Sequence, residues 1–481
     1  MSIVQDELME RAQARVDDYH HYQDIGLIAR NGEFFPGGVH YPPITMYGEM
    51  NEDQMFEGYT MPEDGLLDLY LHIPFCEQRC VFCHYPLKLG NRVAEKDRYL
   101  AAMDKEMDLY MRRLGIDKIR TRSILVGGGT PTFLTLDQQR RFLESVDRHV
   151  DRSACKQYNF DVEPGSLVGP EGTERLRIMR SFGVDRLTIG IQSLDEEIIK
   201  AMNRPHDRKV ALESIENCLR EGFQVNIEFI FGYPGETLEN WKDTVREATS
   251  LGVHEIQLYR LKVEAYGDHQ GPIKKFRELS LADCPPTEIT FMMKQLAIDI
   301  LGEAGYHENV LRRVYSKSKD LFSHYAHNQC CVLLDEIGIG LTAFSSLRDR
   351  FVLNTQKFEE YYANIEAGKL PLNRGIIRSP EEQIRWSIIL PLKNKDIRKS
   401  LFKRRTNGRL LDEVFRPKIA ALKEHGLIWE DEKTMALTTL GKFFADEVVE
   451  CFSAPQYIPF PRSEYAEGPL NPYLHCDPFA N

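Results

Sequence analysis

The 481-residue chain lacks the features of a secreted or membrane-embedded protein. Its first residues, MSIVQDELMERAQARVDDYHHYQ, contain acids throughout and no apolar central run, so they do not form a secretory signal. No apolar run reaches the ~18 residues that a membrane-spanning helix needs. We therefore expect a cytoplasmic protein without membrane contact.

The chain also lacks an excess of basic residues. Its 61 lysines and arginines face 73 acids, and the formal net charge is −12. A protein that binds nucleic acid through its phosphates usually carries the opposite balance, so no nucleic-acid partner is expected. With 42% hydrophobic and 28% charged residues the composition is that of a globular protein, and its length calls for two or three cores, not one.

Structural disulfides are not expected, because cytosolic thiols are kept reduced. Seven of the ten cysteines are scattered and are interpreted as small buried residues. The other three, Cys76, Cys80 and Cys83, stand within eight residues and need a chemical explanation.

From residue 67 onward, short apolar runs rich in β-branched residues alternate with amphipathic stretches of helical period. The expected strands are 69–73, 123–128, 159–163, 186–192, 225–232 and 256–263, and the expected helices are 95–114, 136–150, 172–182, 207–221 and 237–251. Such alternation predicts an α/β fold with a parallel sheet. Six units favour a (β/α)6 partial TIM barrel, with functional groups at the carboxyl ends of the strands. A doubly wound open sheet is the alternative.

Four segments are expected along the chain. Residues 1–66 show no sustained period and are interpreted as an N-terminal arm, and 67–345 form the barrel. Residues 346–450 contain helix-like stretches followed by an alternating hairpin pattern and a last helix, which suggests a winged-helix-like α+β unit. In an acidic chain this unit is expected to pack on the barrel instead of binding DNA. Residues 451–481 form a surface tail.

The segment YLHIPFCEQRCVFCHYP places the three cysteines directly after the first strand. Soft thiolates suit iron–sulfur clusters, zinc or copper(I). A structural zinc site usually has four protein ligands, and no second Cys or His pair follows at the usual spacing. His84 directly follows Cys83 and would strain a tetrahedron. Three cysteines can instead hold three irons of a [4Fe–4S] cluster and leave the fourth open.

The spacing C-x3-C-x2-C is the signature of the radical S-adenosylmethionine (SAM) superfamily. The chain resembles its oxygen-independent coproporphyrinogen III oxidase-like family, in which an aromatic residue and then His-Ile-Pro-Phe lead into the first cysteine; here these are Tyr70 and 72–75. The resemblance implies that Cys76, Cys80 and Cys83 ligate a [4Fe–4S] cluster.

The resemblance also implies a SAM cleft at the strand ends. The run GGGTPT (127–132) matches the stretch that contacts the methionine end of SAM, and its glycines allow close backbone approach and exposed N–H groups. The implied cofactor-binding residues are Tyr70, Phe82, Gly128, Gly129, Thr130, Glu163, Gln192, Arg204 and Glu228. The family usually has Asp at the last of these positions, so the longer Glu228 is a departure.

The implied chemistry is reductive cleavage of one or two SAM molecules to a 5′-deoxyadenosyl radical, with electrons from a flavodoxin or ferredoxin. The oxidases carry a further cysteine where this chain has Tyr85, and the haem-chaperone branch usually has an acid where it has His84. FCHYPLK looks more like the class C methyltransferase branch. The main hypothesis is therefore C-methylation or cyclopropanation of an unsaturated small molecule.

Two alternatives stay open. One is a porphyrin-directed enzyme, either an oxygen-independent coproporphyrinogen III oxidase or a haem-degrading methyltransferase. The other is a non-enzymatic haem-binding chaperone. Candidates for a substrate or second-SAM pocket are Tyr259, Arg260, His307 and Tyr315, which lie near strand ends. The sequence leaves a partner enzyme open and favours a monomer.

Overall fold

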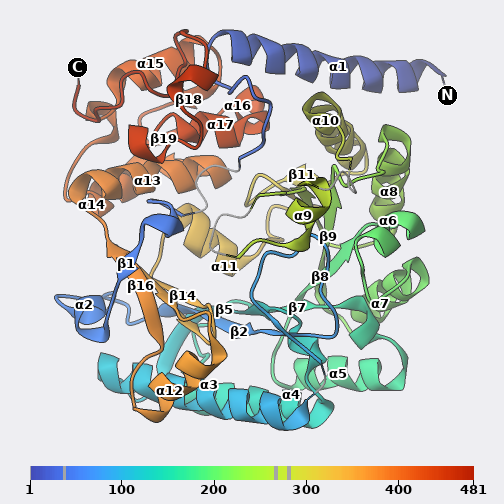
Figure 1. Cartoon of the computed structure of the whole chain (residues 1–481), viewed down its shortest axis with the longest axis vertical. Coiled ribbons are helices and arrows are strands. Elements are labelled where there is room, and N and C mark those ends of the chain that lie inside the picture. The colour runs from blue at the N-terminus through green and yellow to red at the C-terminus, as the bar shows by residue number, and fades with distance from the viewer. Residues whose placement is uncertain (1, 36–39, 91, 265–268, 279–282, 481) are drawn as a thin grey trace.

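A mostly parallel sheet forms the centre of the molecule in the computed structural model, which describes residues 2–35, 40–90, 92–264, 269–278 and 283–480 (Figure 1). Six neighbouring strands are parallel: β2 (Leu67–Ile73), β5 (Ile119–Gly128), β7 (Tyr158–Val162), β8 (Arg186–Gln192), β9 (Gln224–Phe231) and β10 (Glu255–Arg260). The α/β class and the (β/α)6 partial barrel predicted from the sequence are confirmed.

Helices connect these strands. They are α3 (Val93–Leu114), α4 (Leu136–His149), α5 (Gly169–Ser181), α6 (Glu196–Ala201), α7 (Arg208–Arg220) and α8 (Leu238–Ser250). Local sequence fixes several ends. α4 begins with a capping box of Thr135 and Gln138, and α8 begins with one of Thr237 and Asn240. α3 ends at Gly115, whose φ of 66° suits a residue without a side chain. Strong end signals explain why the sequence located these helices closely.

The sheet continues beyond the barrel at both edges. β13 (Glu336–Ile339) runs parallel to β2 and is followed by the antiparallel β14 (Phe344–Leu347), β15 (Arg350–Asn354), β16 (Leu372–Ile377) and β1 (Gly48–Glu49). At the other edge β12 (Val314–Ser316) and β11 (His307–Glu308) pair with β10. The domain boundary predicted at residue 345 therefore cuts through this sheet, because strands beyond it complete the same layer.

The C-terminal unit has its own apolar core. It contains α13 (Pro380–Asn394), β17 (Asp396–Arg398), α14 (Lys399–Arg405), α15 (Arg416–Glu424), β18 (Ile428–Glu430), β19 (Thr434–Leu437), α16 (Thr439–Phe443) and α17 (Ala445–Glu450). Its three strands form an antiparallel sheet in the order β17–β19–β18. Helices on a small hairpin sheet give the winged-helix-like arrangement that the sequence predicted.

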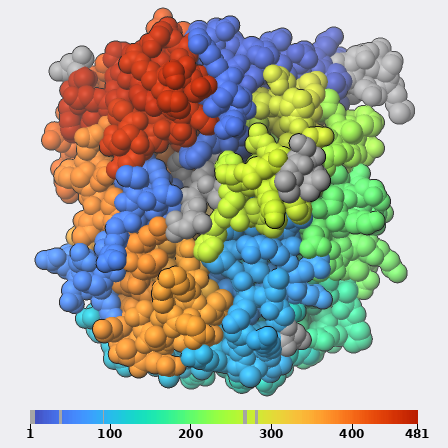
Figure 2. Space-filling view, in the orientation of Figure 1, coloured from blue at the N-terminus to red at the C-terminus, as the bar shows by residue number. Residues whose placement is uncertain are grey.

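The N-terminal arm is more regular than the sequence analysis expected, because α1 (Ser2–Asp24) is a long helix. Leu8, Ala12 and Val16 pack on α10 (Thr287–Glu303), while Tyr19 and Tyr22 join the core of the C-terminal unit. Figure 2 shows the N-terminal residues in dark blue between the red C-terminal unit and the yellow segment. The expectation of irregular chain was wrong here, since apolar residues recur every three to four positions.

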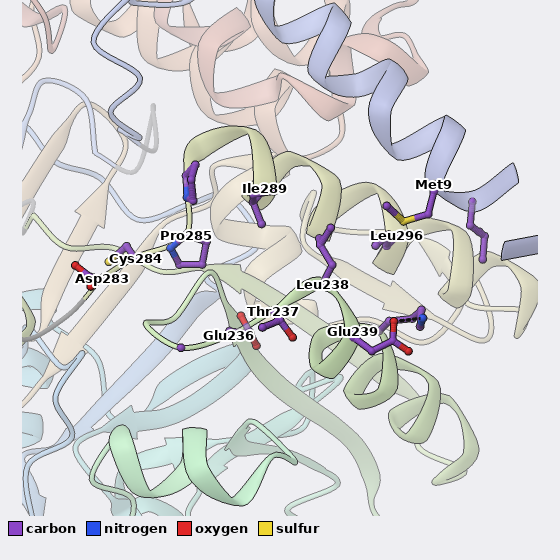
Figure 3. A pocket seen from close by; sticks show the side chains of 14 residues that line it. Met9, Glu236, Thr237, Leu238, Glu239, Asp283, Cys284, Pro285, Ile289 and Leu296 are labelled. Carbon is purple, nitrogen blue, oxygen red and sulfur yellow. Dashed lines mark hydrogen bonds and ion pairs between the residues drawn. The ribbon is translucent and has the colours of Figure 1, made fainter. Parts of the chain in front are cut away.

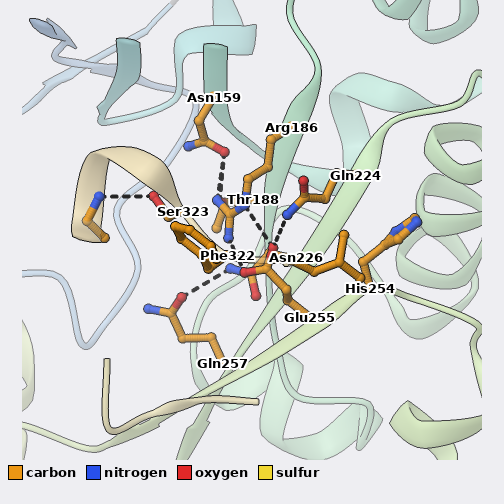
Figure 4. A network of polar contacts seen from close by, with 12 residues as sticks. Asn159, Arg186, Thr188, Gln224, Asn226, His254, Glu255, Gln257, Phe322 and Ser323 are labelled. Carbon is orange, nitrogen blue, oxygen red and sulfur yellow. Dashed lines mark hydrogen bonds and ion pairs between the residues drawn. The ribbon is translucent and has the colours of Figure 1, made fainter. Parts of the chain in front are cut away.

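Polar side chains fill the barrel interior near the start of the strands (Figure 4). Arg186 is 3% exposed and Glu255 is fully buried, and their side chains form a bidentate pair with distances of 3.0 and 2.7 Å. Arg186 also donates to Asn159 and Thr188. Every polar atom of the guanidinium thus has a partner, so this buried ion pair is fully satisfied and has a structural role. No helix among the described residues is long and apolar enough to cross a membrane.

Candidate functional site

The three cysteines lie on one loop, residues 76–85, which we call the cysteine loop. Two distant segments hold it through its backbone. Val81 N–H donates to the Met202 carbonyl at 3.0 Å, and Val81 O accepts from Ile273 N–H at 3.0 Å. A side chain added at Gly271 would meet the Cys83 carbonyl at 2.6 Å, so the close crossing of these two segments requires glycine. The loop is therefore fixed from both sides.

The environment of the thiols fits a [4Fe–4S] cluster. Burial, with smaller contributions from the other two thiols, raises the pKa of Cys76 to about 11, so a thiolate ligand at this position would need a bound cation to stabilise it. Among the described residues, the three sulfur atoms do not all lie within 4.8 Å of one another. Thiolates that share a tetrahedral zinc would stand about 3.8 Å apart, given Zn–S bonds of about 2.3 Å. The wider spacing favours a cluster over a single zinc ion.

The glycine run lies against the cysteine loop. A Cβ at Gly129 would come within 2.8 Å of the Phe75 carbonyl and 2.9 Å of Cys76 Sγ. Gly128 has a φ of 117° and contacts the His72 ring. The exposed N–H groups expected from the sequence are absent at two positions, because Gly129 and Thr130 donate to the carbonyls of residues 73 and 75 at 2.8 Å. The backbone of this glycine run therefore connects the end of β5 to the segment that leads into the cysteine loop.

Arg204 connects the cysteine loop to the barrel. Its Nη1 lies 3.0 Å from Cys80 Sγ and its Nη2 donates to the Gly190 carbonyl at 2.6 Å. Its Nε is buried and has no hydrogen-bond partner among the described residues. The guanidinium thus contacts Cys80, the second of the three cysteines, and keeps its Nε–H available as a donor. Its role in binding the SAM carboxylate stays a prediction.

Glu163 has a partner that the sequence analysis did not assign to the cleft. Its Oε1 lies 2.7 Å from His206 Nδ1, and the His206 side chain is fully buried. Both Arg204 and His206 come from the segment after α6, so one short stretch contacts the cysteine loop and the end of β7. Gln192, with a φ of 72°, is buried beside Gly190 at the end of β8.

Glu228 faces the barrel interior, where its Oε1 accepts from the Tyr259 hydroxyl at 3.2 Å. Its neighbour Asp161 was missed from the sequence. A Cβ at Gly127 would lie 2.6 Å from Asp161 Oδ2 and 3.5 Å from the Tyr70 ring. Burial, and then the Glu228 carboxylate, raise the pKa of Asp161 above its usual range. The strand alternation in DVE could have found it, because residues 161 and 163 share one face.

The four candidates for a second pocket do not lie together. Tyr259 faces the interior, but Arg260 points the other way, with its guanidinium 4.5 Å from the Phe34 ring centre and a bond to Thr287. His307 is exposed at the sheet edge. Tyr315 lies opposite Ile256 and is buried in the main core. Neighbouring strand residues face opposite sides, so Tyr259 and Arg260 cannot both line one pocket.

Phe82 has apolar surroundings. It packs on the apolar cluster of Val81, Met202, Ile230, Tyr233, Leu261 and Ile273. Tyr70, in contrast, faces the interior, where its hydroxyl lies 2.8 Å from His72 Nδ1. The two aromatic residues assigned together to the cofactor therefore occupy different surroundings.

A cavity of about 840 Å³ lies apart from this site, between α1, α8, α10 and Asp283–Pro286 (Figure 3). Met9, Leu238, Ile289 and Leu296 give it an apolar lining. None of the residues predicted to bind the cluster or SAM lines it. The predicted chemistry therefore has a different location from this cavity.

Known proteins resemble this chain in sequence and in fold. Residues 70–248 match the profile of the Radical SAM superfamily. The haem chaperone HemW of Bacillus subtilis is 27% identical over 80% of this chain and 98% of its own. The oxygen-independent coproporphyrinogen III oxidase of Escherichia coli is 25% identical over 89% of this chain and 94% of its own.

A solved structure of the coproporphyrinogen III oxidase HemN from Escherichia coli, a radical SAM enzyme, matches with a TM-score of 0.73 at 21% identity. The match covers 87% of this chain and 96% of that one, and it shows the shared fold. The resemblance to the radical SAM superfamily and its coproporphyrinogen oxidase-like family is confirmed, and with it the expectation of a [4Fe–4S] cluster and SAM.

Proposed function

We propose, from the premise that residues 70–248 form a radical SAM domain, that the chain acts on a tetrapyrrole that carries carboxylates. The curated relatives named above are a haem chaperone and a coproporphyrinogen III oxidase, and both names concern tetrapyrroles. These names favour the porphyrin-directed alternative over the methylation of an unrelated small molecule.

The observation that carries this proposal is an aromatic wall at Tyr70 together with a cation, Arg313, at the Tyr259 ring. Phe344 stacks on Tyr70 with ring centres 5.8 Å apart, and Tyr325 and His40 extend the same wall. Arg313 lies 4.9 Å from the Tyr259 ring centre. Flat aromatic surfaces suit the ring system of a tetrapyrrole, and guanidinium groups suit its carboxylates.

Lys262 adds a second cation to Arg313. Burial, followed by the positive charges of Arg313 and Lys393, lowers the pKa of Lys262 to about 7. The charge of Lys262 in turn helps to lower the pKa of His40, after burial. These groups come from the N-terminal arm, the end of β10, the start of β12 and the C-terminal unit. An anionic substrate group would offset their mutual repulsion.

A [4Fe–4S] cluster with SAM supplies a carbon-centred radical that removes hydrogen from an unactivated C–H bond. The chain's own residues prepare the site for this chemistry. Cys76, Cys80 and Cys83 would hold the cluster, and Arg204 would fix the loop on β8. Glu163 and Gln192 would orient SAM at the strand ends. A one-electron donor of the flavodoxin or ferredoxin kind is the proposed partner.

The test is an anaerobic incubation of the reconstituted, reduced protein with SAM and either coproporphyrinogen III or haem. Consumption of one tetrapyrrole together with release of 5′-deoxyadenosine is the expected result. Haem binding without SAM cleavage would instead assign the chaperone role. Turnover of neither, with the cluster intact and no tetrapyrrole bound, would contradict the proposal.

Methylation remains a second candidate because Tyr85 stands where the oxidases have a further cysteine. A methyltransferase that uses two SAM molecules would release S-adenosylhomocysteine beside 5′-deoxyadenosine in the same incubation. With a deuterated methyl donor, a methylene-radical route would leave two deuterium atoms in the product. Formation of 5′-deoxyadenosine without S-adenosylhomocysteine would exclude this candidate.

A further inference from the structure

Tyr85 ends the cysteine loop and is its exposed aromatic side chain. The residue is 62% exposed, whereas Val81 is buried and Phe82 is partly buried against apolar neighbours. An exposed tyrosine on a protein surface needs no explanation. Tyr85 is different because it lies on the cysteine loop, two residues after Cys83.

The side chains next to Tyr85 are occupied in holding the loop. His84 Nε2 lies 3.1 Å from the Lys262 carbonyl, and its Nδ1 accepts from Gly271 N–H at 2.8 Å. Arg79 donates to the backbone carbonyl of Tyr85 at 2.9 Å. The main chain at Tyr85 is thus fixed, while none of these contacts uses its phenol ring. The loop therefore presents this ring in a defined direction.

The groups that act electrostatically on the Tyr85 phenol belong to the cysteine loop and the barrel. The pKa of the phenol is raised by burial first and then by Cys83, with further contributions from Glu228 and Asp161, while Arg313 lowers it. The phenol also affects the pKa values of Tyr70 and Tyr259. These residues come from β2, β7, β9 and β10 and the start of β12. Tyr85 thus combines an accessible side chain with charged and aromatic neighbours from these strands.

We propose that Tyr85 is the substrate-contacting residue of the cysteine loop and that its ring stacks on the flat face of the substrate. This inference rests on the proposed tetrapyrrole function and adds the residue that places the ring system beside the cluster. Tyr70, an electrostatic neighbour of the phenol, stacks on Phe344, and Arg313 is a second such neighbour. A flat ring held by Tyr85 can thus direct its carboxylates toward the cations.

The contact also bears on specificity. A tyrosine presents a rigid apolar face with few rotatable bonds, so stacking loses little side-chain entropy. A cysteine at this position, as in the oxidases that the chain resembles, would leave more space and no ring. The substrate of this chain should therefore sit differently relative to the cluster than in a protein with cysteine at residue 85.

The experiment measures binding of coproporphyrin III, a stable fluorescent probe, to the full-length reconstituted protein under anaerobic conditions. Tyr85→Ala should weaken binding roughly tenfold, and Tyr85→Phe, which keeps the ring, should weaken it no more than about threefold. Trp429→Ala removes an exposed aromatic residue of the C-terminal unit, 45% exposed, and is the matched control. It should leave the affinity unchanged.

Cluster absorbance and SAM affinity, measured on the same samples, should match the parent protein for both Tyr85 variants. If Tyr85→Ala fails to assemble the cluster, Tyr85→Leu keeps the bulk without the aromatic face and should give the same loss of probe binding. Parent protein that binds no probe would overturn the tetrapyrrole function itself. Parent protein that binds, with Tyr85→Ala and Tyr85→Leu unchanged, would overturn the stacking contact alone. A loss with Tyr85→Phe as large as with Tyr85→Ala would also overturn stacking.

Discussion

Buried charged side chains are hydrogen-bonded differently at the two ends of the barrel, the end where the strands start and the carboxyl end that carries the cysteine loop. At the start of the strands, Arg186 and Glu255 are buried, paired and surrounded by further donors and acceptors (Figure 4). At the carboxyl end, Arg204 Nε and His206 Nε2 are buried without a hydrogen-bond partner among the described residues. Buried polar groups are normally satisfied, so the fully bonded ion pair at the first end stabilises the fold, whereas these two nitrogen atoms at the second end remain available to a ligand.

The largest effect is expected when a thiol at the carboxyl end of the barrel is removed. Replacing Cys76, Cys80 or Cys83 by Ala should abolish iron binding and all SAM cleavage, because three ligands are the fewest that hold the cluster with one iron open. Iron content and cluster absorbance after reconstitution measure this. Cys284→Ala, outside the loop, is the control and should retain the cluster. A cluster retained in any of the three variants would refute that ligand.

A substitution at the start of the strands should change the free energy of unfolding. Arg186→Met leaves the buried Glu255 carboxylate without its charge partner and should lower the free energy of unfolding by about 3–5 kcal/mol, measured by denaturant titration. Arg141→Met breaks an exposed pair with Asp137 and should change it by less than about 1 kcal/mol. Equal effects of the two variants would remove the distinction between a structural and a surface pair.

Substitutions at the carboxyl end of the strands should change the affinity for SAM. Arg204→Ala and Glu163→Ala should each weaken SAM binding by roughly tenfold, since each removes a charged group from the cleft, while stability changes less than in Arg186→Met. Calorimetry on anaerobic protein gives the affinity. Arg208→Ala, four residues after Arg204, is the matched control. Unchanged SAM affinity in both variants would argue against the cleft assignment.

The smallest effect concerns pH. Because the pKa of Lys262 is lowered to about 7, its ammonium is present below that pH and lost above it. Coproporphyrin III binding should therefore weaken a few fold as pH rises through about 7. Lys262→Met should flatten this profile, whereas Lys442→Met, on an exposed lysine, should retain it. The same slope in Lys262→Met would exclude this lysine as the titrating group.

The free energy of unfolding should also depend on Lys262, but it should increase with pH, whereas probe binding weakens. Between about 7 and its ordinary value of 10.5, Lys262 binds a proton in the unfolded chain and not in the folded one. Its contribution to stability therefore increases with pH across that window. A denaturant titration of the parent protein and Lys262→Met at both ends of the window isolates this contribution.

Regular alternation made the barrel predictable from the sequence. The six strands and five helices expected from period and end signals match β2, β5, β7–β10 and their helices closely. α1 was missed even though Leu8, Ala12 and Val16 recur at helical spacing, because acids on its other face hide the period. Local pattern thus identified elements that strong signals delimit and failed where the apolar face is narrow.

The site was predictable only where a motif carries it. The spacing of the cysteines located the cluster loop, but Lys262, Arg313 and His40 meet through long-range packing that no local pattern encodes. Arg260 was wrongly grouped with Tyr259, although the two-residue period of a strand separates them. Asp161 was within reach of the same rule. Side-chain direction in strands would have corrected both assignments without any structure.

The crossing at Gly271 has a consequence for biosynthesis. The cysteine loop is bonded on one side to Met202 and on the other to Ile273, nearly 200 residues after Val81 in the chain. A ribosome that has made the three cysteines has therefore not yet made the segment that encloses them. We therefore expect the nascent thiols to remain accessible to the cell's cluster-assembly machinery until residue 273 has emerged and the loop is enclosed.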